Sequence, residues 1–419
     1  MRLLHLSDWH LGSTLGRLSR APDHDEVLEE MVDLAGEWRP HLIVHSGDLF
    51  DHSRPAVEDL QRGVEALRRL ADTAPVVVLA GNHDSPALFD VFDRLLALGS
   101  RDATSTVRFL GRARPPERGG ILTFPGEDGE EARLAAVPFV HPNAVLDAFD
   151  VPPQRRTAAY TDQVRFVEEV LGDGLRAGYD GGRHILLFAA HLHVGGATFS
   201  GSERPLHITD SYATSVDHLP GVSYAAFGHI HKPQALPGGV VVGRYAGSPI
   251  QIDYGELGEQ KSVVTVEAVP GRPAAVELVH LRGGRPLRRV AGTLEVVGQL
   301  GDVGRCILAA TVDTEEPTPD LAGRIVAMFP AATIFDVVER CRMAQVELAT
   351  ETQDADAEPP VRDLFREYLS SARVPAVAVD RVMSVFSRLL DAVENEAEPT
   401  FDEQELFEPP TAIVEEAPG

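Results

Sequence analysis

The stretch MRLLHLSDWHLGS (residues 1–13) opens with an apolar run typical of a buried strand and places Asp8 and His10 directly after it. Residues i and i+2 of an extended chain lie on one face, so this carboxylate and this imidazole can converge on one point. Oxygen and imidazole nitrogen together suit a divalent metal ion. A surface aspartate beside a loop histidine would also explain the pair, and the remaining sequence decides between the two interpretations.

Four further motifs follow apolar runs in the same way. They are HSGDLFDHS at 45–53 with Asp48, LAGNHDS at 79–85 with Asn82 and His83, AAHLHVGG at 189–196 with His191, and AFGHIHKP at 226–233 with His229 and His231. Glycine before the polar residues suits tight turns in which backbone segments approach closely. Each motif alone has a purely structural interpretation, but five in one chain predict a shared site at strand ends.

The composition indicates a globular protein with room for two or three domains, since 43% of the 419 residues are hydrophobic and 24% are charged. The first apolar run is interrupted too early for a secretory signal, and no run is long enough for a membrane span. Two cysteines, Cys306 and Cys341, are too few for a disulfide framework and fit a reducing cytoplasm. The net charge of -26 argues against binding nucleic acid by general basicity, although not against a metal site that contacts phosphates.

Periodicity predicts two folded parts in the first 346 residues. Residues 1–282 alternate strand-like runs with helical segments such as AVEDLQRGVEALRRLAD (56–72), the pattern of a layered α/β domain with ligands at strand ends. Near residue 285 the density of Gly, Pro and Arg marks a boundary. Residues 286–346 then predict a small α+β unit.

The last part of the chain is acidic. Residues 347–360 predict an acidic linker, and 361–395 predict two amphipathic helices with little core of their own. We expect these helices to bury their apolar stripes on a partner, with packing against their own chain as the alternative. Residues 396–419, rich in Glu and Pro, predict a disordered tail.

The order Asp-x-His, Gly-Asp-x-x-Asp, Gly-Asn-His-Asp, a lone His and Gly-His-x-His resembles the signature of the calcineurin-like metallophosphoesterases. Within them the chain resembles the SbcD family, the nuclease subunits of bacterial SbcCD complexes. In GDLFDHSRP, His52 stands where the Ser/Thr protein phosphatases continue with Asp-Arg-Gly, and RYAGSPIQIDYGE (244–256) resembles the Gly-Ser-Pro segment of the family. The resemblance is specific over residues 1–260 and looser beyond.

The resemblance implies a layered β-sandwich metallophosphoesterase domain flanked by helices, a small α+β DNA-capping domain and a C-terminal helical tail. It also implies two metal sites that share one carboxylate. Asp8, His10, Asp48 and His231 would hold one ion, and Asp48, Asn82, His191 and His229 the other. The mixed ligand set disfavours calcium, and the absence of cysteine disfavours structural zinc. Manganese, iron or zinc would fit the ligands, and the resemblance implies a pair of Mn²⁺ ions.

Two divalent ions about 3.5–4 Å apart can clamp a phosphodiester and lower the pKa of the attacking water. The resemblance implies that His83 stabilises the transition state or protonates the leaving group, and that His52 orients the scissile phosphate. Asp51 and Asp84 are expected to fix ligand histidines. His193 has no counterpart in the family pattern, and its role stays open.

Only two of the 38 basic residues are lysines, Lys232 and Lys261, and neither follows a glycine, so the chain has no Gly-Lys-Ser/Thr phosphate loop. Any ATP dependence therefore needs another polypeptide. The resemblance implies an SbcC-like coiled-coil ATPase bound through 361–395, and a homodimer through helices near 55–72 and 86–98. It implies DNA as the substrate and a role in DNA end processing, repair and recombination.

Three functions stay open from the sequence. The leading one is a DNA nuclease that acts as a double-strand exonuclease and as a single-strand or hairpin endonuclease. A phosphodiesterase for small substrates such as cyclic nucleotides would use the same metal centre, but the small unit and the tail would then lack a purpose. A DNA-end-binding scaffold would not need a full ligand set and both catalytic histidines.

Overall fold

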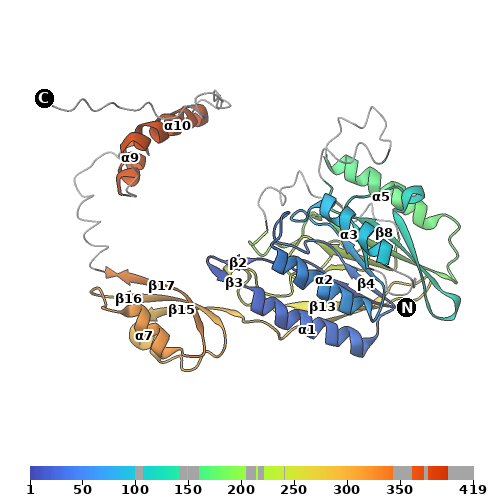
Figure 1. The fold of residues 1–419 in the computed structure, drawn as a ribbon, viewed down its shortest axis with the longest axis horizontal. Helices are drawn as coiled ribbons and strands as arrows, with labels where there is room; N and C mark the ends of the chain where they lie inside the picture. The colour runs from blue at the N-terminus through green and yellow to red at the C-terminus, as the bar shows by residue number, and fades with distance from the viewer. Residues whose placement is uncertain are drawn as a thin grey trace. The chain divides into compact units, whose positions relative to one another are not determined.

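The computed structural model describes residues 1–99, 107–140, 149, 160–203, 214–215, 221–239, 241–342, 361–371 and 376–394. The chain divides into two compact units, Met1–Arg340 and Cys341–Gly419 (Figure 1). In the described ranges, no helix is long and apolar enough to cross a membrane. The predicted acidic linker and disordered tail lie outside the described residues.

A six-stranded sheet in the order β14-β13-β1-β4-β5-β6 carries the first part of the site. Its strands are β1 (Arg2–Leu6), β4 (Leu42–His45), β5 (Val76–Leu79), β6 (Val107–Leu110), β13 (Ser262–Glu267) and β14 (Ala275–His280). The four strands β1, β4, β5 and β6 run parallel to one another, whereas β13 is antiparallel to β1 and to β14. The carboxyl ends of β1, β4 and β5 therefore lie at one edge, and so do the loops that follow them.

A second six-stranded sheet has the order β11-β12-β10-β9-β8-β7. Its strands are β7 (Ile121–Pro125), β8 (Glu131–Val137), β9 (His184–His191), β10 (Tyr224–Gly228), β11 (Gln234–Ala235) and β12 (Gly243–Tyr245). The strands β8, β9, β10 and β12 are parallel, while β7 and β11 pair antiparallel at the two ends. The carboxyl ends of β9 and β10 supply the second part of the site.

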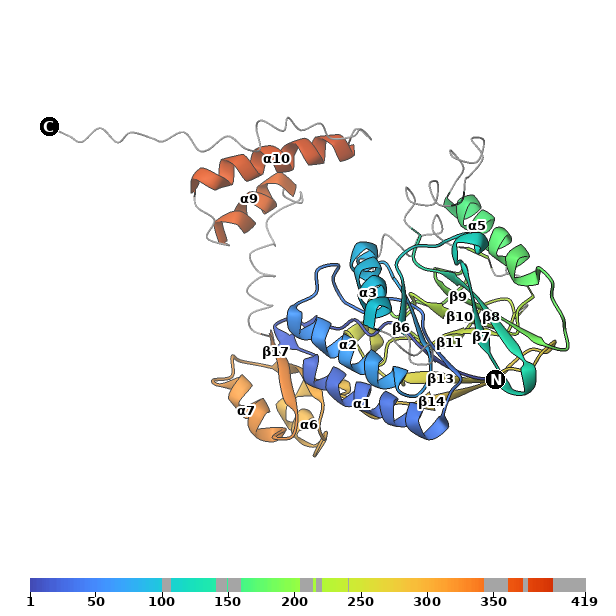
Figure 2. The ribbon, with the colours of Figure 1, turned by 45° about the vertical axis from the view of Figure 1, so that its right-hand side comes forward.

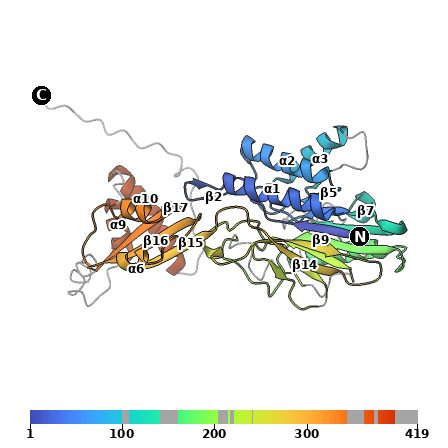
Figure 3. The same ribbon diagram turned by 90° about the horizontal axis from the view of Figure 1, so that it is seen from below.

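The two sheets lie face to face and helices cover their outer sides (Figures 2 and 3). These helices are α1 (Ala21–Trp38), α2 (Val57–Ala71) and α3 (Pro86–Gly99) on the first sheet and α5 (Tyr160–Arg176) on the second. Along β1, Leu4 and Leu6 pack against the helices, whereas Leu3 packs between the sheets. This alternation follows the period of two residues in a strand. The predicted layered α/β fold is confirmed.

A three-stranded sheet with its own apolar core follows the two large sheets. Its elements are β15 (Leu287–Thr293), α6 (Leu294–Gly298), β16 (Ile307–Thr314), α7 (Leu321–Met328) and β17 (Thr333–Cys341). The core includes Val297, Leu308, Ile325 and Phe329, all almost fully buried. Both cysteines are buried, and neither forms a disulfide bond. The remaining short pair, β2 (Thr14–Leu15) and β3 (Leu18–Ser19), forms a hairpin before α1.

The smaller unit contains the helices α9 (Val361–Ser371) and α10 (Ala376–Glu394), close to the predicted bounds. The rings of Phe365 and Phe386 stack with their centroids 4.0 Å apart. Around them lies an apolar recess of about 350 Å³, lined by Phe365, Val382, Val385, Phe386 and Leu389.

Inside the larger unit, α5 carries a buried carboxyl group. Glu168 is 0% exposed, and its oxygens accept hydrogen bonds from the hydroxyl of Thr214 at 3.2 and 3.3 Å. Burial raises the pKa of Glu168 to about 8 from the ordinary value of 4.5. Since the folded protein holds this proton more tightly than the unfolded chain, the free energy of unfolding falls as the pH rises from 4.5 through 8.

We expect Glu168→Gln to abolish this part of the pH dependence, because the amide does not ionise. The variant and the wild type should be about equally stable below pH 4.5, and the variant should be more stable by roughly 2–4 kcal/mol at pH 8. Urea unfolding between pH 4 and 8.5 measures the difference. Parallel curves for the two proteins would contradict the prediction.

Candidate metal centre

The structure brings the predicted ligands together from both sheets. All of them lie at or just beyond the carboxyl ends of parallel strands: Asp8 and His10 after β1, Asp48 after β4, Asn82 after β5, His191 at the end of β9, and His229 and His231 after β10. The two sheets present these ends to one another, so side chains far apart in the sequence converge. The geometry supports the predicted grouping, and the role of each residue as a ligand stays a proposal.

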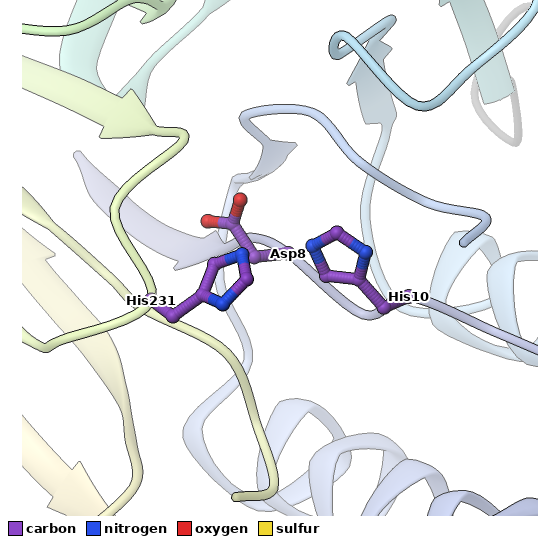
Figure 4. A group of neighbouring side chains, drawn as sticks. All are labelled: Asp8, His10 and His231. Carbon is purple, nitrogen blue, oxygen red and sulfur yellow. The ribbon is translucent and has the colours of Figure 1, made fainter. Parts of the chain in front are cut away.

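One group consists of Asp8, His10 and His231, which are all buried (Figure 4). Each offers a ligand atom within 4.8 Å of those of the other two. Among the described residues, Asp8 Oδ2 and His10 Nε2 have no hydrogen-bond partner. Leaving buried polar atoms unsatisfied costs about 1–3 kcal/mol each, and a bound cation would satisfy both. These residues therefore fit a divalent metal ion.

A second group consists of Asp48, His191 and His229, again with ligand atoms within 4.8 Å of one another. The amide oxygen of Asn82 is 3.0 Å from His191 Nε2 and 2.8 Å from His229 Nδ1, which places it in the same group. Asp48 Oδ2 is 3.3 Å from His191 Nε2 and 3.6 Å from His10 Nε2. Asp48 thus stands between the two groups, where a bridging carboxylate would be needed.

The backbone is sharply turned at four of these residues. Asp8, His10 and Asp48 have φ values of 50°, 47° and 53°, and His229 has a φ of 100°. Such conformations cost of order 1–3 kcal/mol each for residues other than glycine, and they cluster at functional sites. The turns direct side chains into the site immediately after the strands end.

Two glycines let the loops approach one another. A β-carbon on Gly81 would lie 2.1 Å from Asp48 Oδ1, and one on Gly47 would lie 2.1 Å from His191 Nδ1. Gly47 also has a φ of +116°, which other residues rarely adopt. The sequence motifs Gly-Asp at 47–48 and Gly-Asn at 81–82 therefore reflect a steric requirement of the site.

We expect Gly47→Ala to destabilise the fold by about 3 kcal/mol, because it combines a steric clash with backbone strain. Gly119→Ala is the matched control, since Gly119 has a φ of +89° but nothing within 4 Å of its added β-carbon. The control should cost only about 1 kcal/mol. Urea unfolding of both variants measures the difference, and equal losses would show that the contact with His191 is unimportant.

The electrostatics of the site favour a cation. Burial, with the neighbouring charge of Asp48, raises the pKa of Asp8 to about 6. For His191, burial opposes protonation, but the Asp48 carboxylate raises the pKa to about 9. For His231, burial likewise opposes protonation, but the Glu256 carboxylate raises the pKa to about 9. The neighbouring carboxylates therefore stabilise positive charge at this site, including the charge of a protonated histidine.

The two predicted catalytic histidines lie beside the ligands in different settings. The backbone N–H of His83 donates to Asp48 Oδ1 at 2.8 Å, and His83 Nδ1 is 2.7 Å from the carbonyl oxygen of Asp51. His52 is 71% exposed at its side chain, with Nε2 3.3 Å from Asp51 Oδ2. His83 therefore contacts one of the proposed ligands directly, whereas His52 is largely exposed to solvent.

The predicted supporting carboxylates behave differently from one another. Asp51 Oδ1 is 3.2 Å from His10 Nδ1, as expected for a group that fixes a ligand histidine. The prediction for Asp84 is wrong: its carboxylate accepts hydrogen bonds from the backbone N–H groups of 49, 50 and 81. Through these hydrogen bonds, Asp84 connects the loop that follows β4 to the loop that follows β5. The reason is geometric, since three inward-facing N–H groups surround the buried carboxyl.

His193 is buried, and its ring packs against that of Phe199 with centroids 4.9 Å apart. It belongs to none of the candidate metal groups among the described residues. Its position two residues after His191 is therefore explained by packing.

Phe139, which the sequence analysis did not single out, lies with its ring 6.3 Å from the rings of both His191 and His229.

Sequence reasoning also missed a polar cluster behind His231. Glu256 Oε1 is 3.1 Å from His231 Nδ1, and the hydroxyl of Ser202 is 2.7 Å from the same nitrogen. Burial alone would raise the pKa of Glu256, but His231 and Lys261 hold it well below its usual range. Glu203 accepts from the backbone N–H of His231 at 3.1 Å. Glu256 ends the segment 244–256, whose resemblance to the family was noted for its Gly-Ser-Pro motif, but nothing in that segment indicates a contact with His231.

Comparison with known proteins agrees with this geometry. Residues 1–233 match the sequence model of the family described as Calcineurin-like phosphoesterase. The chain is 30% identical to the SbcD component of the SbcCD nuclease of Bacillus subtilis (strain 168), over 94% of this chain and 99% of that protein. It is 28% identical to the protein of the same name from Escherichia coli (strain K12), over 95% of this chain and 100% of that protein.

A third relative is the DNA double-strand break repair protein Mre11 of Aeropyrum pernix. It is 27% identical over 65% of this chain and 62% of that protein. The two bacterial relatives match the chain over almost its whole length, whereas the family model covers the part that builds the candidate metal centre. The chain therefore belongs to the calcineurin-like phosphoesterases and, within them, to the SbcD family.

Proposed function

We propose that the chain is the nuclease subunit of an SbcCD-type complex, which hydrolyses DNA phosphodiester bonds with two divalent metal ions. The observation that carries the proposal is the convergence of two adjoining ligand groups on either side of Asp48. The names of the similar proteins, nuclease and double-strand break repair protein, support DNA as the substrate. We assign to it double-strand exonuclease and single-strand or hairpin endonuclease activity in DNA end processing, repair and recombination.

Asp8, His10, Asp48 and His231 would hold one ion, and Asp48, Asn82, His191 and His229 the other. Two such ions, manganese by family resemblance, would neutralise phosphate charge and activate water for attack on phosphorus. The chain itself fixes the distance between the two sites through Asp48, whose Oδ1 is held by the backbone N–H of His83. The proposed ligands are buried except for the half-buried Asn82, so a substrate would have to present its phosphate to them from outside.

We assign proton transfer to His83 and phosphate orientation to His52. A carbonyl oxygen can only accept a hydrogen bond, so the contact with the backbone of Asp51 places a proton on His83 Nδ1. Nε2 is then the ring nitrogen that we assign to proton exchange with the leaving group. The exposure of His52 suits contact with a phosphate that arrives from solvent.

The test is cleavage of end-labelled linear and hairpin DNA by the full chain with Mn²⁺, with and without an SbcC-like ATPase and ATP. Cleavage of both substrates supports the proposal. Hydrolysis of cyclic nucleotides without DNA cleavage would favour the small-substrate phosphodiesterase. Binding of DNA ends without any hydrolysis would favour the scaffold.

We further propose that 361–395 binds the coiled-coil ATPase. The apolar recess between α9 and α10 supports this, because Leu389 is 40% exposed beside it. A partner helix could bury this surface as helices do in apolar grooves.

A homodimer through α2 and α3 is supported by exposed Val57, Val64, Val91 and Leu95. A cytoplasmic location fits the small number of cysteines, neither of which forms a disulfide bond.

Deleting residues 355–395 should abolish co-purification of the ATPase while metal-dependent nuclease activity persists. In the full chain, Leu389→Asp should weaken ATPase binding at least about tenfold, because it places a charge in an apolar contact. Ser384→Asp is the control, since Ser384 is exposed and does not line the recess. Pull-down titrations measure both, and undiminished binding of the Leu389 variant would refute the assignment.

A further inference from the structure

The loop that ends at Glu256 forms a closed polar cluster behind the metal centre. A short 3-10 helix, Tyr254–Glu256, delivers the Glu256 side chain to His231, and Glu256 is 0% exposed. Its Oε1 is 3.1 Å from His231 Nδ1 and also accepts a hydrogen bond from the hydroxyl of Ser202. A fully buried carboxylate beside a histidine of the metal centre requires an explanation, because burying a charge is costly.

The other carboxylate oxygen of Glu256, Oε2, also has more than one partner. Glu256 Oε2 is 2.7 Å from Lys261 Nζ and accepts from the backbone N–H of Ile252 at 3.0 Å. Lys261 also donates to the backbone carbonyl of His231 at 3.1 Å. The carboxylate therefore has a counter-charge and cannot rotate without losing several contacts at once.

This arrangement decides which nitrogen of His231 carries the proton. A carboxylate only accepts hydrogen bonds, so the contact with Glu256 places the proton on Nδ1 of the neutral ring. Nε2 then keeps its lone pair, which is the form that binds a metal ion. A carboxylate on the far nitrogen also makes an imidazole a stronger ligand.

The two ligand groups differ in the hydrogen-bond partner of their histidine Nδ1 atoms. In the group with Asp8, both imidazoles have a carboxylate on Nδ1, namely Asp51 for His10 and Glu256 for His231. In the other group, Nδ1 of His191 is 2.9 Å from the backbone carbonyl of Ser46 instead. A change at Glu256 should therefore affect one ion and spare the other.

We infer that Glu256 is a positioning residue for the metal centre. Glu256 holds His231 in the tautomer and orientation required by the ion that Asp8, His10 and His231 would bind. Lys261 supplies the counter-charge that makes the buried carboxylate tolerable. The inference rests on the metal sites of the proposed function but not on DNA as the substrate. A titration of metal without nucleic acid therefore tests it separately from the nuclease assay.

The experiment is a calorimetric Mn²⁺ titration of the full chain, supported by electron paramagnetic resonance of the bound ion. Glu256→Gln is nearly isosteric but lacks the charge, and should weaken one of the two sites by 10–100-fold while the other keeps its affinity. The matched control is Glu259→Gln. Glu259 also contacts Lys261, at 2.8 Å, but makes no contact with His231. It should leave both sites unchanged.

Wild-type affinity at both sites in Glu256→Gln would overturn the inference, and so would an equal loss at both sites. Equal weakening in the Glu259 variant would assign the effect to Lys261 rather than to the contact with His231. If the single variant does not fold, Glu256→Gln with Lys261→Met removes the buried charge pair together, which core packing tolerates better than one unpaired charge. The double variant should show the same loss at one site, and two intact sites would again overturn the inference.

Discussion

His83→Ala should lower the rate of DNA cleavage by about 10²–10⁴-fold, the usual contribution of a positioned acid or base. Both metal ions should still bind, because the contact of His83 with Asp48 comes from its backbone N–H, which alanine retains. The backbone carbonyl of Asp51, which orients the imidazole, is likewise unchanged by the substitution. The loss should therefore appear in kcat for end-labelled DNA and not in the Mn²⁺ titration.

His280→Ala is a suitable control, because it also removes an imidazole but from an exposed position on β14. It should cleave DNA at the wild-type rate. Wild-type cleavage by the His83 variant would exclude the acid–base assignment. Loss of one bound ion would contradict it in another way, since His83 also lies within 4.8 Å of ligand atoms of His10 and Asp48 and would then be a ligand itself.

The convergence of the first half of the candidate metal centre was predictable, because its polar residues directly follow strands. The runs before Asp8, Asp48 and Asn82 are short and apolar, and parallel strands of one sheet end at one edge. The period of two residues then suffices to place Asp8 and His10 near one another. Nothing beyond local patterning and the geometry of parallel sheets is needed for these residues.

The supporting contacts were not predictable in the same way. Glu256 lies in an irregular segment with no periodicity, and its contact with Ser202 joins residues 54 positions apart. Asp23 is another case: with its pKa lowered to about 2 against the effect of burial, it binds Arg20 and Arg285, the latter 262 positions away. From the sequence, polar residues in such segments cannot be distinguished from exposed surface residues. The partners that compensate for their burial can be identified only in the three-dimensional structure.

The same reasoning explains why Asp84 was assigned wrongly. Its place beside Asn82 and His83 suggested a partner for a ligand histidine, but three backbone N–H groups surround the carboxyl instead. Sequence spacing shows which residues can reach a site. It does not show which backbone groups turn toward them, since that depends on the loops after β4 and β5 together.

Asp48→Asn should have a larger effect than any substitution that touches only one ion. The carboxylate of Asp48 lies between the two ligand groups, with Oδ2 near His191 and His10 and Oδ1 bound by His83. Asparagine offers one oxygen and no charge, so it cannot serve two cations and also accept from the backbone. We expect both Mn²⁺ affinities to fall and DNA cleavage to drop roughly 10³-fold or more.

Asp51→Asn provides the comparison, because it makes the same chemical change at a carboxylate that contacts only His10 among the proposed ligands. It should weaken one ion by 10–100-fold, as supporting groups usually do. Thermal unfolding of both variants without metal separates loss of binding from loss of fold. If Asp48→Asn binds two ions as tightly as the wild type, Asp48 is not shared between them. A loss confined to one ion would assign Asp48 to that ion alone, and the two ligand groups would then be independent sites.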